Sequence, residues 1–326
     1  MDVGQTRSRD AVVSGLDGLI PANATLTKLA TGATWSEGPV WMPESATVRW
    51  SDIPGNRIMQ YSTVDGSTSD YATDVEFTNG RTLDLDGTVI QCSHGRRRVE
   101  RDDHGVVTSL VDSYNGVRLN SPNDVVVAPD GSIWFTDPPY GITVPVEGHP
   151  GEREYGDCYV FRFDPVSEAL WPVVTDMFHP NGLAFSPDGS ILYVSDTADD
   201  VGRYNGEHIR AYDVVDGRCK NGRGFASVSS GVSDGFRIDV NGNLWTSAAD
   251  GVHVFGANGS WLGSVSIEEK VANVCFGGPD GQHLFIAAST SLYGIQTLTR
   301  DAASHDPELP ELTDAGSPVR RESQEA

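Results

Sequence analysis

The stretch "PNGLAFSPDGSILYVSD", residues Pro180 to Asp196, has the pattern of two short strands joined by a tight turn. An Asn-Gly pair opens an apolar run, Pro-Asp-Gly supplies the turn, and a second apolar run ends at an aspartate. A close copy, "PNDVVVAPDGSIWFTD", spans Pro122 to Asp137. This repetition predicts that the fold uses one supersecondary unit several times.

Looser copies of the same phrase begin at Ser36, Thr78, Ser233 and Ala272, which brings the number of units to six. Each unit opens with an oxygen-bearing side chain; these lead residues are Glu37, Asn79, Asn123, Asn181, Asp234 and Asn273. Their spacing of about 40 to 60 residues is typical of propeller blades, each a four-stranded sheet. We therefore predict an all-β fold, a six-bladed β-propeller with a central channel, over residues 34–300.

The flanking and inserted segments have a different composition. Residues 1–33 form an expected N-terminal arm, and the apolar run at residues 19–32 can add a strand that closes the ring. Residues 301–326 are acidic and poor in aromatic side chains, which predicts a disordered tail. Polar, glycine-rich insertions at residues 139–157 and 197–208 predict long loops that can form the rim of a pocket.

The composition excludes several classes of partner. A formal charge of -23 disfavours nucleic acid, which needs a basic surface. No apolar run is long enough to cross a bilayer and no signal peptide is evident, so we expect a cytoplasmic protein without a membrane partner. The oligomeric state stays open. The four cysteines are far apart in sequence and are expected to be ordinary buried thiols: Cys92, Cys158, Cys219 and Cys275.

The lead residues acquire a chemical meaning from propeller geometry. The innermost strand of every blade lines the channel, so equivalent repeat positions form a ring around one axis. Carboxylate and amide oxygens without His or Cys suit a hard cation, which predicts a metal in the channel mouth. The alternative is that Asn and Asp before Gly are local turn residues. Glu37 has no turn-forming role but occupies the same slot, which favours the metal.

These motifs closely resemble those of the SMP-30/gluconolactonase family of six-bladed propeller lactonases. The similarity extends in family order from about Leu19 to Leu298, and its main motifs are "SEGPVW" (36–41), "SHGRRRV" (93–99), "RLNSPNDVVV" (118–127), "WFTDPPYG" (134–141), "PNGLAFSPDG" (180–189) and "SDGFRIDVNGNLW" (233–245).

The resemblance implies specific roles. Glu37, Asn181 and Asp234 would bind one divalent cation, and Asp234 would also be the catalytic acid and base. Asn123 would face the substrate, and His94 matches a family position that can face the pocket or be structural. Ca²⁺ is the favoured cation, with Mg²⁺, Mn²⁺ or Zn²⁺ as alternatives. The implied reaction is hydrolysis of a small sugar lactone to the aldonic acid, with the bound cation polarising the carbonyl.

Other functions remain compatible with the same motifs. A calcium-dependent aryl ester or phosphotriester hydrolase would use the same ligands, and a non-catalytic calcium-binding propeller would hold the cation without a competent pocket. A serine nucleophile is disfavoured. Residues 231–235 match G-x-S-x-G around Ser233, but a period-2 strand follows instead of the helix that this motif requires.

Overall fold

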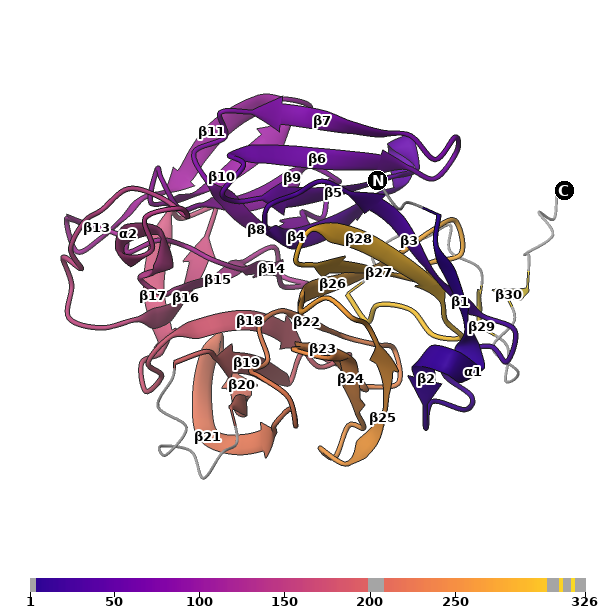
Figure 1. Ribbon diagram of the computed structural model, residues 1–326. Helices are drawn as coiled ribbons and strands as arrows, with labels where there is room; N and C mark the ends of the chain where they lie inside the picture. The colour runs from indigo at the N-terminus through magenta and orange to yellow at the C-terminus, as the bar shows by residue number, and fades with distance from the viewer. Residues whose placement is uncertain (1–3, 199–207, 304–310, 313–317, 320–326) are drawn as a thin grey trace, which may run out of the picture.

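The computed structural model describes residues 4–198, 208–303, 311–312 and 318–319. Within these residues, six antiparallel sheets of four or five strands are arranged around a central axis (Figure 1). The expectation of a six-bladed β-propeller is thereby confirmed. The first strand of each sequence repeat lies at the centre of the molecule, and the next strands of each repeat follow outward (Figure 1).

The strands are short and follow the sequence repeats. Blade 1 has β4 (Ser36–Met42), β5 (Thr47–Asp52), β6 (Arg57–Ser62) and β7 (Thr68–Thr73). Blade 2 has β8 (Thr78–Leu83), β9 (Val89–Ser93), β10 (Arg98–Asp103) and β11 (Val106–Val111). Blade 3 has β14 (Val125–Val127), β15 (Ile133–Asp137), β16 (Tyr159–Asp164) and β17 (Ala169–Val174).

The second half of the ring is built in the same way. Blade 4 has β18 (Pro180–Phe185), β19 (Ile191–Asp196), β20 (Ile209–Val215) and β21 (Arg218–Ala226). Blade 5 has β22 (Phe236–Ile238), β23 (Leu244–Ala248), β24 (Gly251–Phe255) and β25 (Trp261–Ser266). Blade 6 has β26 (Val271–Gly277), β27 (His283–Ala288) and β28 (Ser291–Gln296).

The N-terminal arm completes the ring. Its strand β3 (Thr25–Thr31) pairs antiparallel with β28 and is the fourth strand of blade 6. Strand β1 (Thr6–Ser8) adds to β3, and after the helical turn α1 (Arg9–Val12) strand β2 (Val13–Ser14) pairs with β25 of blade 5. The first and last thirds of the chain are therefore joined by backbone hydrogen bonds.

The hairpin of the opening stretch shows how each repeat folds. Leu183 pairs with Val194 and Ala184 with Tyr193, so the apolar alternation places Leu183 and Val194 in a buried core. The turn is fixed by Asp188, whose Oδ1 accepts hydrogen bonds from the backbone N–H of Ser190 (3.0 Å) and from its hydroxyl (2.7 Å). The Pro-Asp-Gly phrase is thus a turn, as the sequence predicts.

Apolar side chains pack between neighbouring blades. Trp245 of blade 5 meets Phe276 of blade 6 edge-on at 5.7 Å between ring centroids, and Trp134 of blade 3 meets Phe185 of blade 4 at 5.2 Å. Burying each such side chain stabilises the fold by about 2 kcal/mol. The cysteines are all free thiols, as expected, and Cys219 alone is partly exposed.

The remaining elements are small. They are the 3-10 turn η1 (Pro43–Ser45), the β12 (Ser113–Tyr114) and β13 (Val117–Arg118) pair, and helix α2 (Tyr140–Thr143) inside the first insertion, which the sequence had suggested to be loop throughout. The tail contributes only the paired β29 (Glu311–Leu312) and β30 (Pro318–Val319); the rest of residues 304–326, where disorder was expected, lies outside the described residues. No helix in the described part of the chain is long and apolar enough to cross a membrane.

Candidate metal centre and active site

The lead residues all lie where the inner strand of a blade is irregular. In blades 1, 2, 4 and 6 the register of the inner ladder shifts at or beside the lead residue, and in blades 3 and 5 the inner strand begins two residues later. Such a bulge frees a side chain from the alternation of the sheet and re-aims it. Side chains of lead residues from different blades come together: Asn273 hydrogen-bonds Glu37, and Asn79 and Asn123 both contact His94.

Backbone hydrogen bonds link the lead positions of neighbouring blades. The N–H of Gly80 donates to the carbonyl of Asn123 (2.8 Å), and the N–H of Gly182 donates to the carbonyl of Asp234 (3.0 Å). A Cβ added to Gly182 would lie only 2.3 Å from that Asp234 oxygen, so this close approach requires glycine. Gly80 and Gly182, which follow the lead residues Asn79 and Asn181, thus bring the inner strands of neighbouring blades into contact.

Glu37 is a buried carboxylate, with 5% of its surface exposed. Its Oε2 accepts hydrogen bonds from the backbone N–H of Gly38 (2.7 Å) and from the side-chain amide of Asn273 (3.2 Å). Burial, followed by repulsion from Asp234 and Asp124, raises the pKa of Glu37 well above its ordinary value. The structure thus places Glu37 and Asp234, from blades 1 and 5, within electrostatic range of each other.

Asp234, which precedes the inner strand of blade 5, is only partly exposed. Loss of solvation raises the pKa of this carboxyl from 3.8 to about 7. Glu147 and Asp124 add to the increase, while the charge of Lys270 and a hydrogen bond from Asn181 oppose it. A carboxyl with a pKa near neutrality can both accept and donate a proton under physiological conditions.

Asn181, the third predicted ligand, is 6% exposed and fixed from one side. Its amide nitrogen donates to the hydroxyl of Thr197 (3.2 Å), which also shares a hydrogen bond with the hydroxyl of Tyr140. The ring of His179 packs edge-on against Tyr140, with 5.4 Å between centroids. The same amide also hydrogen-bonds the carboxylate of Asp234. Because the nitrogen is the donor in both contacts, the carbonyl oxygen is the atom of this side chain that can act as a ligand.

His94 lies behind the lead residues and is completely buried. Its Nε2 faces the amide nitrogens of Asn79 (3.3 Å) and Asn123 (3.5 Å), and its Nδ1 lies 3.1 Å from the carbonyl oxygen of Glu147. Burial lowers the pKa of His94 to about 4, so the ring is neutral. It therefore accepts at Nε2 and donates from Nδ1. His94 orients Asn79 and Asn123, whose oxygens are turned away from the ring.

The donor set can be compared with what a metal requires. No group of three or more His, Cys, Asp or Glu side chains gathers at a site suited to a metal within the described ranges. Two facing carboxylates and an amide are hard oxygen donors that fit Ca²⁺ or Mg²⁺ and do not favour Zn²⁺. A cation between Glu37 and Asp234 would also relieve the repulsion from Asp234 that helps to raise the pKa of Glu37.

Sequence patterns alone did not identify three charged residues near the site. Asp124 follows a lead residue, is 1% exposed and lies 3.8 Å from Arg237. Lys270 directly precedes the inner strand of blade 6, and its Nζ lies 5.2 Å from the ring centroid of Trp35. Glu147 lies in the first insertion and is coupled electrostatically to Lys270. Asp124 and Lys270 could have been found from the sequence, because each lies next to the start of an inner strand. No sequence pattern marks Glu147.

The first insertion is tied to blade 2 beside the site. His149 lies 2.8 Å from the carboxylate of Glu76 and packs edge-on against Phe77. Glu76 and Phe77 have φ angles of 56° and 55°, and Asp74 has 54°, a conformation that costs free energy for residues other than glycine. Strained backbone of this kind is frequent at functional sites. The second insertion lies mostly outside the described residues.

The serine of the G-x-S-x-G match has no nucleophilic role. Ser233 is fully buried, and its hydroxyl hydrogen-bonds the hydroxyl of Thr246 at 2.7 Å. The segment after it enters strand β22, as the sequence indicated. A nucleophile of this class needs an exposed hydroxyl on a strand-to-helix turn.

Comparison with known proteins places the chain in a family. Residues 35–290 match the model of the SMP-30/Gluconolactonase/LRE-like region. The chain is 33% identical to a gluconolactonase of Zymomonas mobilis, over 87% of this chain and 84% of that protein. It is 28% identical to a pentonolactonase of Haloferax volcanii, over 81% and 85%. Among solved structures, a gluconolactonase from Xanthomonas campestris has a TM-score of 0.83 and 38% identity, over 91% of this chain and 98% of that one.

Proposed function

The chain belongs to the SMP-30/gluconolactonase/LRE-like family and is a lactonase, and we propose that it hydrolyses a sugar lactone to the aldonic acid with one divalent cation held by Glu37, Asn181 and Asp234. The observation that supports this proposal is that two poorly solvated carboxylates, Glu37 and Asp234, interact electrostatically, and that the amide of Asn181 hydrogen-bonds Asp234. Ca²⁺ is the favoured cation because all these donors are oxygens.

The protein's own residues supply the proton transfers. Hydrolysis of a lactone adds water to the carbonyl carbon, breaks the bond to the ring oxygen and requires a proton at that oxygen. Asp234 accepts the proton of the attacking water at its carboxylate and returns it to the departing ring oxygen. When bound, the cation supplies a Lewis acid for the carbonyl. Glu37 stays a ligand because Gly38 and Asn273 hold its Oε2.

Substrate orientation is assigned to side chains around Asp234. Asn123 presents its amide oxygen away from His94 and binds a sugar hydroxyl or the lactone group. His94 acts through Asn123, since the ring is fully buried. Lys270 and Glu147, which both interact electrostatically with Asp234, offer a donor and an acceptor that suit a polyhydroxylated substrate. The gluconolactonase and pentonolactonase relatives support a sugar lactone as the substrate class.

Substitution of the catalytic carboxylate tests the reaction. Asp234→Asn removes the base at nearly constant shape, and loss of a positioned acid or base lowers a rate by about 10²- to 10⁴-fold. The assay follows acid release from glucono-, galactono- and xylonolactones with a pH indicator. Asp188→Asn, in a surface turn of blade 4, is the matched control and should keep full activity. Undiminished activity of Asp234→Asn on every lactone would refute the assignment.

A further inference from the structure

A chain of hydrogen bonds connects the first insertion to the proposed catalytic carboxylate. It begins at the hydroxyl of Tyr140 in helix α2 and passes to the hydroxyl of Thr197, directly after strand β19. Oγ1 of Thr197 accepts from the amide nitrogen of Asn181 at 3.2 Å, and the same nitrogen donates to the carboxylate of Asp234. One chain therefore joins both insertions to blades 4 and 5.

The hydroxyl of Thr197 can take only one role toward Asn181. A hydroxyl has one hydrogen and two acceptor lone pairs. The carbonyl oxygen of His179 lies 3.4 Å from Oγ1 and can only accept. Tyr140 is protonated and can donate, because burial raises the pKa of its phenol above the ordinary value. Whether the hydrogen of Thr197 goes to His179 or to Tyr140, a lone pair of Oγ1 faces Asn181.

This arrangement determines which way round the amide of Asn181 lies. Its nitrogen faces two acceptors, Oγ1 of Thr197 and the carboxylate of Asp234. An amide turned by half a rotation would place its carbonyl oxygen against both of these oxygens and lose both hydrogen bonds. The observed orientation leaves the carbonyl oxygen on the opposite edge of the amide.

Both hydroxyls of the chain are held by well-fixed backbone. The N–H of Thr197 donates to the carbonyl of His179 at 3.1 Å, and the ring of His179 packs edge-on against Tyr140 at 5.4 Å. Helix α2 lies directly against blade 2, since a Cβ added to Gly141 would lie only 2.6 Å from the Cβ of His94. Tyr140 and Thr197 are therefore able to impose an orientation on a third side chain.

We propose that Thr197 is a positioning residue of the cation site, whose hydroxyl, held by Tyr140, fixes the amide of Asn181 with its carbonyl oxygen toward the cation. Because it takes Asn181 as a ligand, this role rests on the proposed function. Thr197 acts through Asn181 and needs no contact with the cation or the substrate. Loss of its hydroxyl should therefore weaken cation binding, and excess cation should restore the lactonase rate.

Calorimetry of Ca²⁺ binding to the chelated full-length chain tests this role. Thr197→Val keeps the shape and should weaken Ca²⁺ about fivefold, the loss typical of one hydrogen bond, whereas Thr197→Ser should bind within about twofold of wild type. The lactonase rate of Thr197→Val should fall at limiting Ca²⁺ and recover at saturating Ca²⁺. Thr297→Val is the matched control. It removes a buried hydroxyl that donates to the carbonyl of Gln282 (2.9 Å) in blade 6, and should leave Ca²⁺ affinity unchanged.

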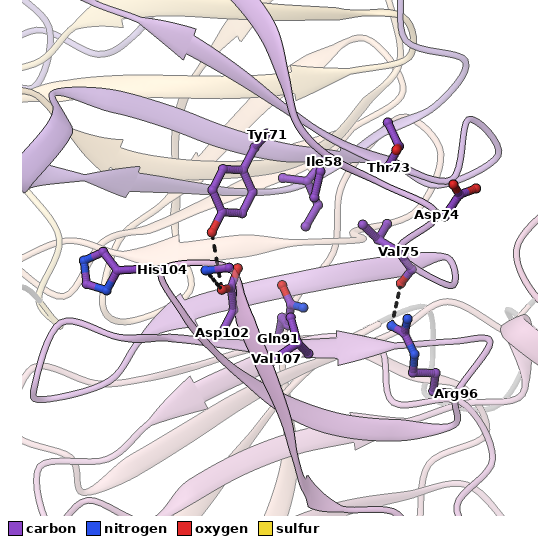
Figure 2. A pocket seen from close by; sticks show the side chains of 12 residues that line it. Ile58, Tyr71, Thr73, Asp74, Val75, Gln91, Arg96, Asp102, His104 and Val107 are labelled. Atoms are coloured by element: carbon purple, nitrogen blue, oxygen red, sulfur yellow. Dashed lines mark hydrogen bonds between the residues drawn. The ribbon is translucent and has the colours of Figure 1, made fainter.

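A double-mutant cycle tests the part played by Tyr140. Tyr140→Phe keeps the ring and removes the donor, and should weaken Ca²⁺ about threefold in the wild-type background and not at all in Thr197→Val. Tyr71→Phe is the control. It makes the same change in the polar interface between blades 1 and 2, where the Tyr71 hydroxyl donates to Asp102 (3.3 Å; Figure 2), and should not alter Ca²⁺ affinity.

The amide can also be observed without metal. In nitrogen-15 NMR spectra of the metal-free chain, the two side-chain amide protons of Asn181 should be protected from exchange, and Thr197→Val should expose one of them. Wild-type Ca²⁺ affinity in Thr197→Val, equal losses in Thr197→Ser and Thr197→Val, or additive effects of Tyr140→Phe and Thr197→Val would overturn the proposal. If wild type binds no cation, the proposed function fails instead, and an amide unchanged by Thr197→Val would then overturn the role of Thr197 independently.

Discussion

Replacement of Asp234 by Asn should stabilise the metal-free protein while destroying its activity. Burial and neighbouring carboxylates raise the pKa of Asp234 from 3.8 to about 7, so its ionised form is destabilised in the folded state. At about 1.4 kcal/mol per pKa unit, the full cost above pH 7 is about 4 kcal/mol. Partial exposure of the side chain reduces this cost, so we expect Asp234→Asn to raise the free energy of unfolding by about 2 to 4 kcal/mol.

The pH dependence of stability provides a second test of whether ionised Asp234 destabilises the fold. Because the folded pKa is raised, the cost of ionising Asp234 is absent below pH 3.8, increases between pH 3.8 and 7, and is constant above pH 7. Asparagine does not ionise. The gain in the free energy of unfolding from Asp234→Asn should therefore be about 1 to 2 kcal/mol at pH 5 and largest at pH 8.

Urea unfolding of chelated wild type and variant at pH 5 and pH 8 measures these differences. The control is Asp188→Asn, where the carboxyl accepts turn hydrogen bonds that lower its pKa to about 2, so substitution should not stabilise the fold. Added Ca²⁺ should raise the stability of wild type and not that of Asp234→Asn. A variant less stable than wild type at pH 8, or a gain that does not grow from pH 5 to pH 8, would refute the reasoning.

Three further substitutions have defined outcomes. Asn181→Ala should weaken Ca²⁺ binding at least tenfold by calorimetry, whereas Asn79→Ala, at the same repeat position, should not; equal effects would remove Asn181 from the ligand set. Lys270→Gln removes a charge that lowers the pKa of Asp234, so the acid limb of the kcat/KM profile should move to higher pH; an unmoved limb contradicts this. Gly182→Ala places a Cβ 2.3 Å from a carbonyl and should cost about 1 to 3 kcal/mol in urea unfolding, and no loss would argue against the close approach.

Most of the fold could be predicted because a propeller repeats its sequence signals. The hairpin phrase at Pro180 recurs with its turn residues, and each copy became the first two strands of a blade. The propeller axis then explains why lead residues far apart in sequence, such as Glu37 and Asp234, come into electrostatic range. The local sequence pattern and the symmetry of the ring were together sufficient to predict the blades and the proximity of the lead residues.

Residues outside the repeat could not be placed in this way. Glu147 lies in an insertion that no other blade shares, and only the folded loop brings it near Asp234 and Lys270. The full burial of His94 could not be predicted from the sequence either, since a histidine at a strand end can face either the pocket or the core. The polar interface between blades 1 and 2 depends on which faces of two sheets meet. These features arise from tertiary packing rather than from sequence period.

The central claim is that one divalent cation at the channel mouth is required for lactone hydrolysis. The most direct measurement is the initial rate of gluconolactone hydrolysis by chelated protein as Ca²⁺ is added in steps, with Mg²⁺ and Mn²⁺ in parallel. We predict a rate near background without metal, and recovery that saturates at one equivalent per chain when the cation binds tightly. Full activity of the chelated protein, with no response to any added cation, would contradict the claim.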